Sequence, residues 1–355
     1  MRVLVIKTSS LGDIIHTLPA LTDAANAIPD VQFDWVVEEA FQEIPAWHYK
    51  VDRVIPVSIR RWRGALLKTW WNGEWRDFKK AIGEQEYYAV IDAQGLLKSA
   101  MLTRYAKGPS YGLNATSARE PLASRNYDHG VNVPKGQHAV ERVRQLFAKS
   151  LGYDISSPVA DAGIRPENLT LPEDQSTPYL MFFHGTTWDT KHWPEFYWQQ
   201  LAQLAAKAGY RIKLPWGNDI ELARAERIAA DNDQVDVLPK SSLSELAGWI
   251  VKSRGVVAVD TGLAHLSAAL NVPSVSLYGP TDPGLSGAYG KNQVHLYANY
   301  ECAPCLKREC TYQGPKVKNQ LIIGQGQYVE PPCFSSLMPG YVFQTLKEKI
   351  LEGGR

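Results

Sequence analysis

The sequence has little of several features that define specialised protein classes. Only 4 of its 355 residues are cysteine, and no apolar run approaches the roughly 20 residues of a membrane-spanning helix. The 38 basic and 37 acidic residues leave a formal net charge of +1, whereas a protein that coats nucleic acid is strongly basic. The first apolar run, MRVLVIK, is too short for a signal peptide. We therefore expect a globular cytoplasmic protein with no nucleic-acid partner.

The glycine fingerprints of common nucleotide-binding loops are also missing. The segment after the first predicted strand is KTSSLGD, which matches neither the G-x-G-x-x-G pattern nor the Walker loop. This absence disfavours a nicotinamide dehydrogenase and a P-loop enzyme. A nucleotide site in this chain therefore has to use a different set of contacts.

Apolar strand patterns alternate with amphipathic helix patterns along both halves of the chain. The predicted strands are residues 2–7, 32–37, 53–57 and 88–93, and then 179–184, 211–214, 235–238, 256–260 and 274–278. The predicted helices are residues 14–28, 96–106 and 138–151, and then 194–208, 219–230, 242–253 and 263–270. This alternation is typical of an α/β fold with doubly wound parallel sheets. We expect domains at 1–160 and 178–340, a proline-punctuated linker at 161–177, and a last helix within 341–355 that packs back on the first domain.

Polar residues follow several of the predicted strands, where ligands bind in doubly wound sheets. Three loops combine hydroxyl groups, glycine and charge at a strand-to-helix turn: residues 7–13, 184–191 and 260–265. Backbone N–H groups at such turns bind anions, and a lysine adds a point charge for a diphosphate. Each loop also has a structural interpretation, because Asp13 suits a helix N-cap, Lys191 a solvated loop, and His265 a buried structural histidine. Glu221 suits either a ribose contact or a solvated helix face.

Long segments of the chain resemble glycosyltransferase family 9, and within it the type I lipopolysaccharide heptosyltransferases. The segments include KTSSLGDIIHTLPAL, VIDAQGLLKSA, SAREPLAS, KHWPE, KLPWG, VDTGLAHLSAAL and YGPTDPG, and the resemblance runs from Met1 to about Gln293. It implies the GT-B fold, in which two Rossmann-like domains face each other across a cleft. It also implies an inverting transfer of L-glycero-D-manno-heptose from ADP-heptose to the first Kdo of Kdo2-lipid A, at the cytoplasmic face of the inner membrane. Neither a metal nor a cofactor is expected.

The resemblance assigns roles to individual residues. Asp13 matches the general base, and Lys191 matches a catalytic cation that contacts the donor diphosphate. The other residues that match donor contacts are Thr186, Thr187, Glu221, Ser241, Asp260, Thr261, Gly262 and His265. The residues that match acceptor contacts are Ser10, Gly12, Arg60, Arg61, Arg63, Lys98 and Arg119.

A basic, tryptophan-rich segment lies between residues 60 and 80. It holds seven of the basic residues against Glu74 and Asp77, together with Trp62, Trp70, Trp71 and Trp75. Basic residues mixed with interfacial aromatic residues suit an anionic membrane surface, and lipid A carries phosphates. The alternative is a solvated helix whose tryptophans face the core.

The four cysteines all lie in an insertion at residues 300–335 that the resemblance does not cover. Cys302, Cys305, Cys310 and Cys333 allow a structural metal site, disulfides or free thiols. The insertion leaves open heptosyltransferase II, or another family 9 transferase with a different acceptor or donor sugar, as the alternative function.

Overall fold

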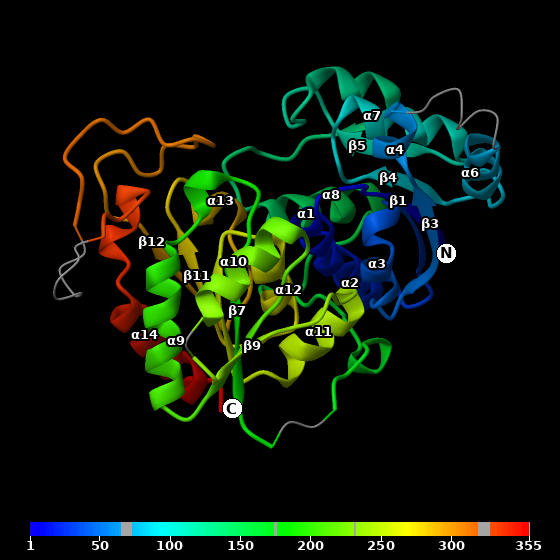
Figure 1. The fold of residues 1–355 in the computed structure, drawn as a ribbon. Helices are drawn as coiled ribbons and strands as arrows, with labels where there is room; N and C mark the ends of the chain where they lie inside the picture. Colours follow the sequence, from blue (N-terminus) through cyan, green and yellow to red (C-terminus); the bar gives the residue numbers. More distant parts are fainter. Residues whose placement is uncertain (65–72, 174–175, 231, 319–326, 355) are drawn as a thin grey trace. The chain divides into compact units, whose positions relative to one another are not determined.

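The computed structural model describes residues 1–64, 73–173, 176–230, 232–318 and 327–354. The chain forms two compact units, Met1–Asn168 and Leu169–Arg355 (Figure 1). The boundary falls inside the predicted linker, of which the first part belongs to the first unit. The backbone N–H of Tyr49, for example, donates to the carbonyl of Gly163 at 3.3 Å.

The first unit contains a six-stranded parallel sheet in the order β3-β2-β1-β4-β5-β6. Its strands are β1 Arg2–Ile6, β2 Gln32–Glu38, β3 Val51–Val57, β4 Ala89–Asp92, β5 Ser110–Leu113 and β6 His129–Val131. Val3 and Val5 point to one face of the sheet and Leu4 and Ile6 to the other, and all four are fully buried. A continuous apolar run is therefore what this central strand requires.

The second unit repeats the same topology. Its sheet has the order β12-β11-β10-β7-β8-β9, so that in both units the first strand lies beside the fourth. The strands are β7 Tyr179–Phe183, β8 Arg211–Leu214, β9 Val235–Val237, β10 Gly255–Val259, β11 Ser274–Tyr278 and β12 Gln293–Tyr297. The strand order reverses between β1 and β4 and again between β7 and β10. These two switch points are where doubly wound sheets bind ligands.

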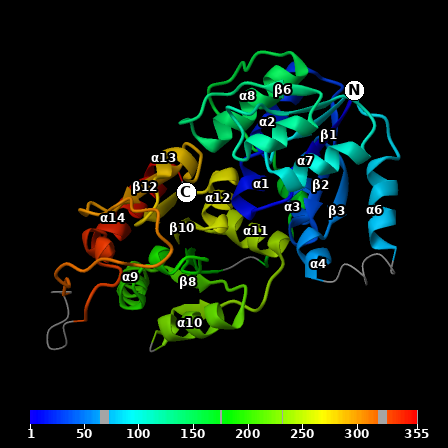
Figure 2. The same cartoon turned by 90° about the horizontal axis from the view of Figure 1, so that it is seen from above.

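Helices cover both faces of the first sheet. They are α1 Leu11–Ile15, α2 Leu18–Ala27, α3 Glu43–Ala46, α4 Ile59–Gly64, α6 Glu74–Ile82, α7 Leu97–Ala100 and α8 Ala139–Leu151, with 3-10 turns η1 Glu39–Phe41, η2 Met101–Tyr105 and η3 Pro121–Asn126. Helices α2 and α8 pack against each other (Figure 2). On the other face, Trp62, Phe78 and Ile82 of α4 and α6 join Leu4 and Ile6 in one core.

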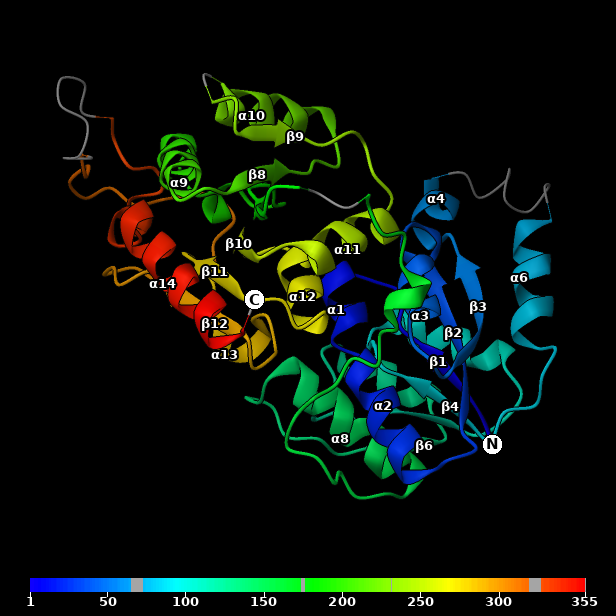
Figure 3. The same ribbon diagram turned by 90° about the horizontal axis from the view of Figure 1, so that it is seen from below.

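Helices also cover both faces of the second sheet. They are α9 Glu195–Lys207, α10 Asp219–Ala229, α11 Leu243–Lys252, α12 Gly262–Ala269, α13 Pro283–Ser286 and α14 Pro339–Glu352, with η5 Asp189–Lys191 and η6 Pro332–Ser336; η4 Pro166–Asn168 ends the first unit. Helix α9 contacts α10 and α14, whereas α11 contacts α12 (Figure 3). The core of this unit lies mainly under α9 and α14.

Two expectations about the elements differ from the structure. The predicted helix at 14–28 is two helices, α1 and α2, because Pro19 in the first turn of α2 lacks an N–H and its ring excludes a preceding helical turn. The short strands β5, β6 and β12 were not predicted, since they lack a sustained apolar pattern. The last helix, α14, packs on the second sheet, since Val342, Leu346 and Ile350 are in the core of the second unit. Its packing on the first domain stays a prediction.

No helix of the described residues is long and apolar enough to cross a membrane.

Candidate functional site

The switch point of the first sheet brings together the loops that follow β1 and β4. Ile6 lies opposite Asp92 in the parallel register of β1 and β4. The segments that follow these two strands therefore leave the same edge of the sheet side by side. The buried Lys7 ammonium donates to the carbonyl of Ala93 at 2.9 Å. The Gln94 side chain accepts from the backbone N–H groups of Thr8 and Ser9 at 3.0 and 3.2 Å. The loop that leads to Asp13 is thus fixed by the neighbouring strand.

Asp13 lies in the first turn of α1 with its side chain 46% exposed. Its Oδ2 accepts from both the backbone N–H and the hydroxyl of Ser10, at 2.8 and 3.0 Å. Ser10 is the N-cap residue, so the structural interpretation of Asp13 as an N-cap is wrong in position: Asp13 is the third helical residue of a capping box. Its Oδ1 lies 4.0 Å from the Lys7 ammonium. The cap therefore engages one carboxylate oxygen, while the side chain stays accessible.

The charge around Lys7 connects further predicted acceptor residues to this loop. Burial lowers the pKa of Lys7, the charges of Asp13 and Asp92 oppose that effect, and Arg119 and Arg142 add to it. Arg119 is exposed, and its charge acts on Lys7. Lys98 is half-buried and follows Leu97, whose N–H donates to Glu120 at 2.7 Å. Gly12 is buried inside α1 and offers no exposed side chain.

The three predicted acceptor arginines of α4 have different environments. Arg61 is clamped by two carboxylates, at 3.1 Å from Glu39 and 2.8 Å from Glu74. Arg60 is exposed, and its guanidinium lies 6.0 Å from the ring of Phe41. The side chain of Arg63 lies outside the described residues. Of this group, Arg60 is therefore the better candidate for an anionic ligand, because the charge of Arg61 is already compensated.

Two of the four tryptophans of the basic segment, Trp62 and Trp75, lie within the described residues. Trp62 is 7% exposed and packs edge-on against Trp75 and Phe78. Its indole N–H donates to Glu74 at 2.7 Å. These two tryptophans face the core, as the structural alternative predicts. Trp70 and Trp71 lie outside the described residues.

The switch point of the second sheet collects most of the predicted donor residues. Phe183 at the end of β7 pairs with Ala258 near the end of β10, which brings the loops after both strands together. The Lys191 ammonium lies 2.7 Å from Asp260 Oδ2, and the Thr281 hydroxyl donates to the same oxygen at 2.7 Å. The Thr186 hydroxyl donates to the carbonyl of Asp260 at 3.0 Å. We call Thr186, Lys191, Asp260 and Thr281 the donor cluster.

The remaining donor candidates lie around the ends of neighbouring strands. Glu221 belongs to the first turn of α10, which Asn218 caps at 3.0 Å. Its Oε2 accepts from the N–H of Gly217 at 2.8 Å, and a Cβ atom on Gly185 would lie 2.7 Å from its carboxyl carbon. The loop after β7 therefore requires glycine where Glu221 approaches it. The Ser241 hydroxyl donates to its own loop, at 2.9 Å from the Pro239 carbonyl.

Helix α12 begins directly after Asp260. Thr261 is its N-cap, with a side chain that makes no cap hydrogen bond, and Gly262 is its first residue. The N-terminal amides of this helix are thus a potential anion site beside the donor cluster. His265 lies one turn further along the helix and is only 8% exposed. This burial favours the structural interpretation of His265 over a direct ligand contact. Thr187 is exposed.

The four cysteines are free thiols. Burial, together with the charges of the other three thiols, raises the pKa of Cys333 to about 12, so the four groups lie near one another. Within the described ranges, no group of three or more His, Cys, Asp or Glu side chains is arranged to hold a metal ion. In the described structure the four cysteines are therefore neither paired as disulfides nor arranged as a metal-ligand group. A structural metal site at these cysteines stays a prediction.

Sequence reasoning overlooked three residues that organise these sites. Thr281 belongs to the YGPTDPG segment after β11, and its place at a strand end is the signal that could have identified it. Lys7 was noted only as part of a loop, because its burial is not visible in the sequence. Trp188 supports the Lys191 ammonium, which lies 4.5 Å from the centre of its ring.

The family of the chain follows from its match to a known model. The model of glycosyltransferase family 9 (heptosyltransferase) matches residues 75–316, which is more than half of the chain. The chain belongs to glycosyltransferase family 9. It is similar to the lipopolysaccharide heptosyltransferase 1 of Pseudomonas aeruginosa, with 56% identity over 352 residues that cover 99% of this chain and 98% of the relative.

Two solved structures of the Escherichia coli heptosyltransferase WaaC are also similar. The complex with ADP has a TM-score of 0.85 and 47% identity, and the match covers 98% of this chain and 100% of that one. The complex with ADP-2-deoxy-2-fluoro heptose has a TM-score of 0.78 and 52% identity, covering 84% and 93%. The predicted GT-B architecture of two Rossmann-like units is confirmed, and the chain is a glycosyltransferase. The predicted cleft between the units stays a prediction.

Proposed function

We propose that this family 9 enzyme is a type I lipopolysaccharide heptosyltransferase. Its substrates are ADP-L-glycero-D-manno-heptose and the first Kdo of Kdo2-lipid A, and the transfer inverts the anomeric configuration. The observation that carries the proposal is the similarity to a lipopolysaccharide heptosyltransferase 1 over 99% of the chain. The complex of a similar enzyme with an ADP-heptose analogue supports the donor.

On the acceptor side, Asp13 acts as the general base. One carboxylate oxygen takes the proton of the acceptor hydroxyl as the hydroxyl oxygen forms a bond to the anomeric carbon of heptose. The bond between that carbon and the diphosphate oxygen breaks, and ADP leaves with the bonding electrons. A single displacement needs one carboxylate and gives inversion. The capping box supports this role, because Ser10 fixes the carboxylate through Oδ2.

On the donor side, the protein supplies the positive charge that ADP needs as it leaves. Lys191 and the amides at the start of α12 stabilise the developing charge on the diphosphate, aided by the hydroxyl groups of Thr186, Thr187 and Thr261. Asp260 pairs with the Lys191 ammonium at 2.7 Å. A bound diphosphate would compete for that ammonium and free Asp260 to accept from heptose hydroxyl groups. Gly262 permits close approach of the diphosphate, and His265 lies behind it.

The nucleoside part of the donor extends along neighbouring strand ends. Glu221 accepts from ribose hydroxyl groups, since its carboxylate approaches Gly185 and Gly217 of two adjacent loops. Ser241 lies beside the adenine and contributes its backbone. No cofactor is required by this mechanism, because all steps are proton transfer and displacement.

The acceptor is anionic, and basic residues of the first unit recognise it. Ser10 and Gly12 lie next to the base, and Lys98 and Arg119 flank it. Arg60, Arg61 and Arg63 of α4 contact phosphates or carboxylates of the lipid-linked acceptor. Arg60 makes a stronger contact than Arg61, because Glu39 and Glu74 already compensate the charge of Arg61. A basic segment of this kind also suits peripheral attachment to the cytoplasmic face of the inner membrane.

The alternative is heptosyltransferase II or a family 9 transferase with another donor sugar. The test compares ADP release with four substrate pairs: ADP-heptose or UDP-glucose as donor, and Kdo2-lipid A with or without a first heptose as acceptor. We expect turnover only with ADP-heptose and the acceptor that lacks heptose. Turnover that requires the heptose-bearing acceptor would establish the type II activity, and turnover with UDP-glucose would reject the donor assignment.

A further inference from the structure

The cysteine-containing insertion is attached to the loop that carries Lys191. Thr190, the residue before Lys191, is buried. Its hydroxyl donates to the carbonyl of Lys307 at 2.6 Å, and its backbone N–H donates to the carbonyl of Arg308 at 3.4 Å. Two consecutive peptide units of the insertion are thus held against the donor loop.

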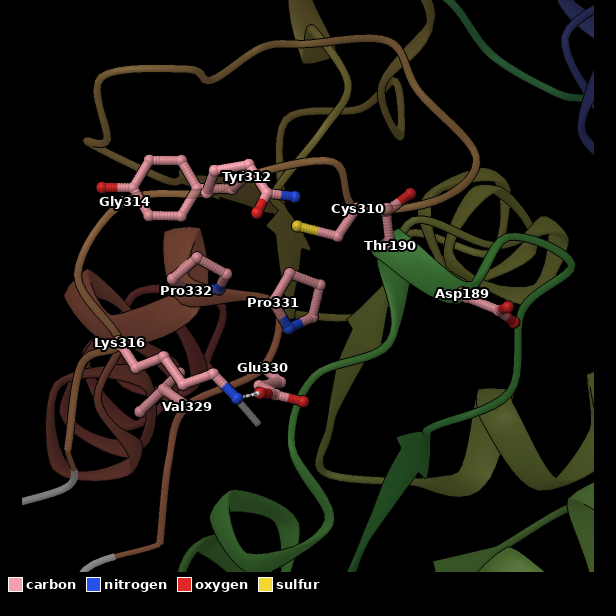
Figure 4. A pocket seen from close by; sticks show the side chains of 11 residues that line it. Asp189, Thr190, Cys310, Tyr312, Gly314, Lys316, Val329, Glu330, Pro331 and Pro332 are labelled. Atoms are coloured by element: carbon pink, nitrogen blue, oxygen red, sulfur yellow. Dashed lines mark hydrogen bonds and ion pairs between the residues drawn. The ribbon is translucent and has the colours of Figure 1, made fainter.

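Residues of the loop and of the insertion also line a common pocket. Its volume is about 500 Å³. Figure 4 shows Thr190 and Asp189 on one side of this pocket, with Cys310, Pro331, Pro332 and the ion-paired Lys316 and Glu330 on the others. The insertion is therefore built onto the donor loop by both hydrogen bonds and packing.

This attachment places a second cation beside the loop. The Arg308 guanidinium lies 5.3 Å from the centre of the Trp188 ring, and the Lys191 ammonium lies 4.5 Å from the same centre. Cation–π contacts of this kind hold a cation without neutralising it. Lys191 has a carboxylate partner in Asp260, whereas Arg308 forms no ion pair within the part of the chain that the structure describes. Arg308 is also exposed and so open to a ligand.

We propose that Arg308 is a donor-binding residue that brings a second positive charge to the diphosphate of the nucleotide sugar. The inference rests on the proposed function, because it assumes that the loop at Lys191 binds the diphosphate. A guanidinium presents a planar set of donors that matches two phosphate oxygens. The ring of Trp188 orients the guanidinium beforehand, and Thr190 fixes the backbone from which it extends. The insertion thereby becomes part of the donor site.

The test measures the affinity of the full-length protein for ADP by calorimetry, with adenosine as the probe that lacks phosphate. The variants are Arg308→Gln, Arg308→Lys and the matched control Lys307→Gln. Lys307 carries the same charge one residue earlier, but its ammonium donates to the Thr311 hydroxyl at 2.8 Å. We expect Arg308→Gln to weaken ADP binding about tenfold or more, the scale of a lost charge-assisted hydrogen bond.

The other variants should separate the role of Arg308 from general effects. Arg308→Lys should keep only part of the affinity, because it retains the charge but loses the planar set of donors. Lys307→Gln should stay within about twofold, and adenosine binding should not change. Equal losses in Arg308→Gln and Lys307→Gln, an equal loss for adenosine, or an ADP affinity within about twofold of the unaltered protein in Arg308→Gln would each overturn the inference.

Lys191→Ala distinguishes this inference from the proposed function. If Lys191→Ala weakens ADP binding and Arg308→Gln does not, only the role of Arg308 fails. If Lys191→Ala also binds ADP normally, the diphosphate does not bind at this loop, and the donor assignment itself fails.

Discussion

Asp13 combines a structural and a proposed chemical task in one carboxylate. The Ser10 N–H and hydroxyl both use Oδ2, so removal of the side chain by alanine would disturb the helix start as well as the base. Asp13→Asn is the sharper variant, since its amide oxygen still accepts from Ser10 but does not take a proton at neutral pH. We expect kcat to fall by about 100-fold or more, with ADP affinity unchanged within about twofold. A kcat within about threefold of the unaltered enzyme would leave Asp13 with the capping task alone.

The arginines of α4 make a second test at the scale of single residues. Arg61 already has two carboxylate partners, whereas Arg60 is exposed beside Phe41. We expect Arg60→Gln to raise KM for Kdo2-lipid A by roughly fivefold, the scale of about 1 kcal/mol for one basic residue near an anionic surface. Arg61→Gln should have the smaller effect on KM, and ADP affinity should be unchanged in both variants. The opposite order in steady-state assays would show that the acceptor displaces Glu39 and Glu74 from Arg61.

At the scale of elements, α14 connects the end of the chain to the second sheet. Leu346 is fully buried between this helix and the sheet, and Leu351 on the same helix is 77% exposed. Leu346→Ala should lower the free energy of unfolding by about 2–5 kcal/mol, because it leaves a cavity in the core. Leu351→Ala should change the unfolding free energy by less than about 0.5 kcal/mol. Equal effects of the two substitutions in denaturant titrations would contradict the packing of α14 described here.

The sequence predicts elements well where burial is complete and poorly where it is partial. Strand β7, with the sequence YLMFF, is buried at every position, so its apolar run is unambiguous. Strand β6, with the sequence HGV, is an edge strand of three residues with two exposed positions, and its pattern is too weak to detect. The residues of the candidate site also differ in how strong their local sequence signal is. Strand ends identify Asp13 and Asp260, but the contact of Thr190 with Arg308 spans 118 residues of sequence and has no local signal.

Buried histidine makes the stability of the whole chain depend on pH. His48 accepts from the Lys50 N–H through Nδ1 at 3.1 Å, so its neutral ring carries hydrogen on Nε2 and donates to Thr22 at 3.0 Å. Burial lowers the pKa of His48 to about 3. Below about pH 6.5 the unfolded chain binds a proton at this residue that the folded chain excludes, so stability falls as the pH drops from there toward the folded pKa.

The expected slope is about 1.4 kcal/mol per pH unit for this one group. Denaturant titrations at pH 7, 6 and 5 should show that His48→Gln depends less on pH than the unaltered protein by about that slope. Carboxylates that titrate in the same range affect both proteins alike and cancel in the comparison. Parallel pH profiles would mean that folding leaves the pKa of His48 unchanged, and would contradict its burial as a neutral ring.

The proposed reaction is a single displacement with one carboxylate base and a leaving group that the protein stabilises. Such a displacement inverts the anomeric configuration of the transferred sugar. The most direct measurement is the mass and the anomeric configuration of the product formed from ADP-heptose and Kdo2-lipid A, determined by mass spectrometry and NMR. The account predicts an acceptor heavier by one heptose, joined through a linkage of configuration opposite to that of the donor. A linkage that retains the donor configuration would require a second nucleophile and would contradict the role of Asp13, and an acceptor of unchanged mass would contradict the proposed function.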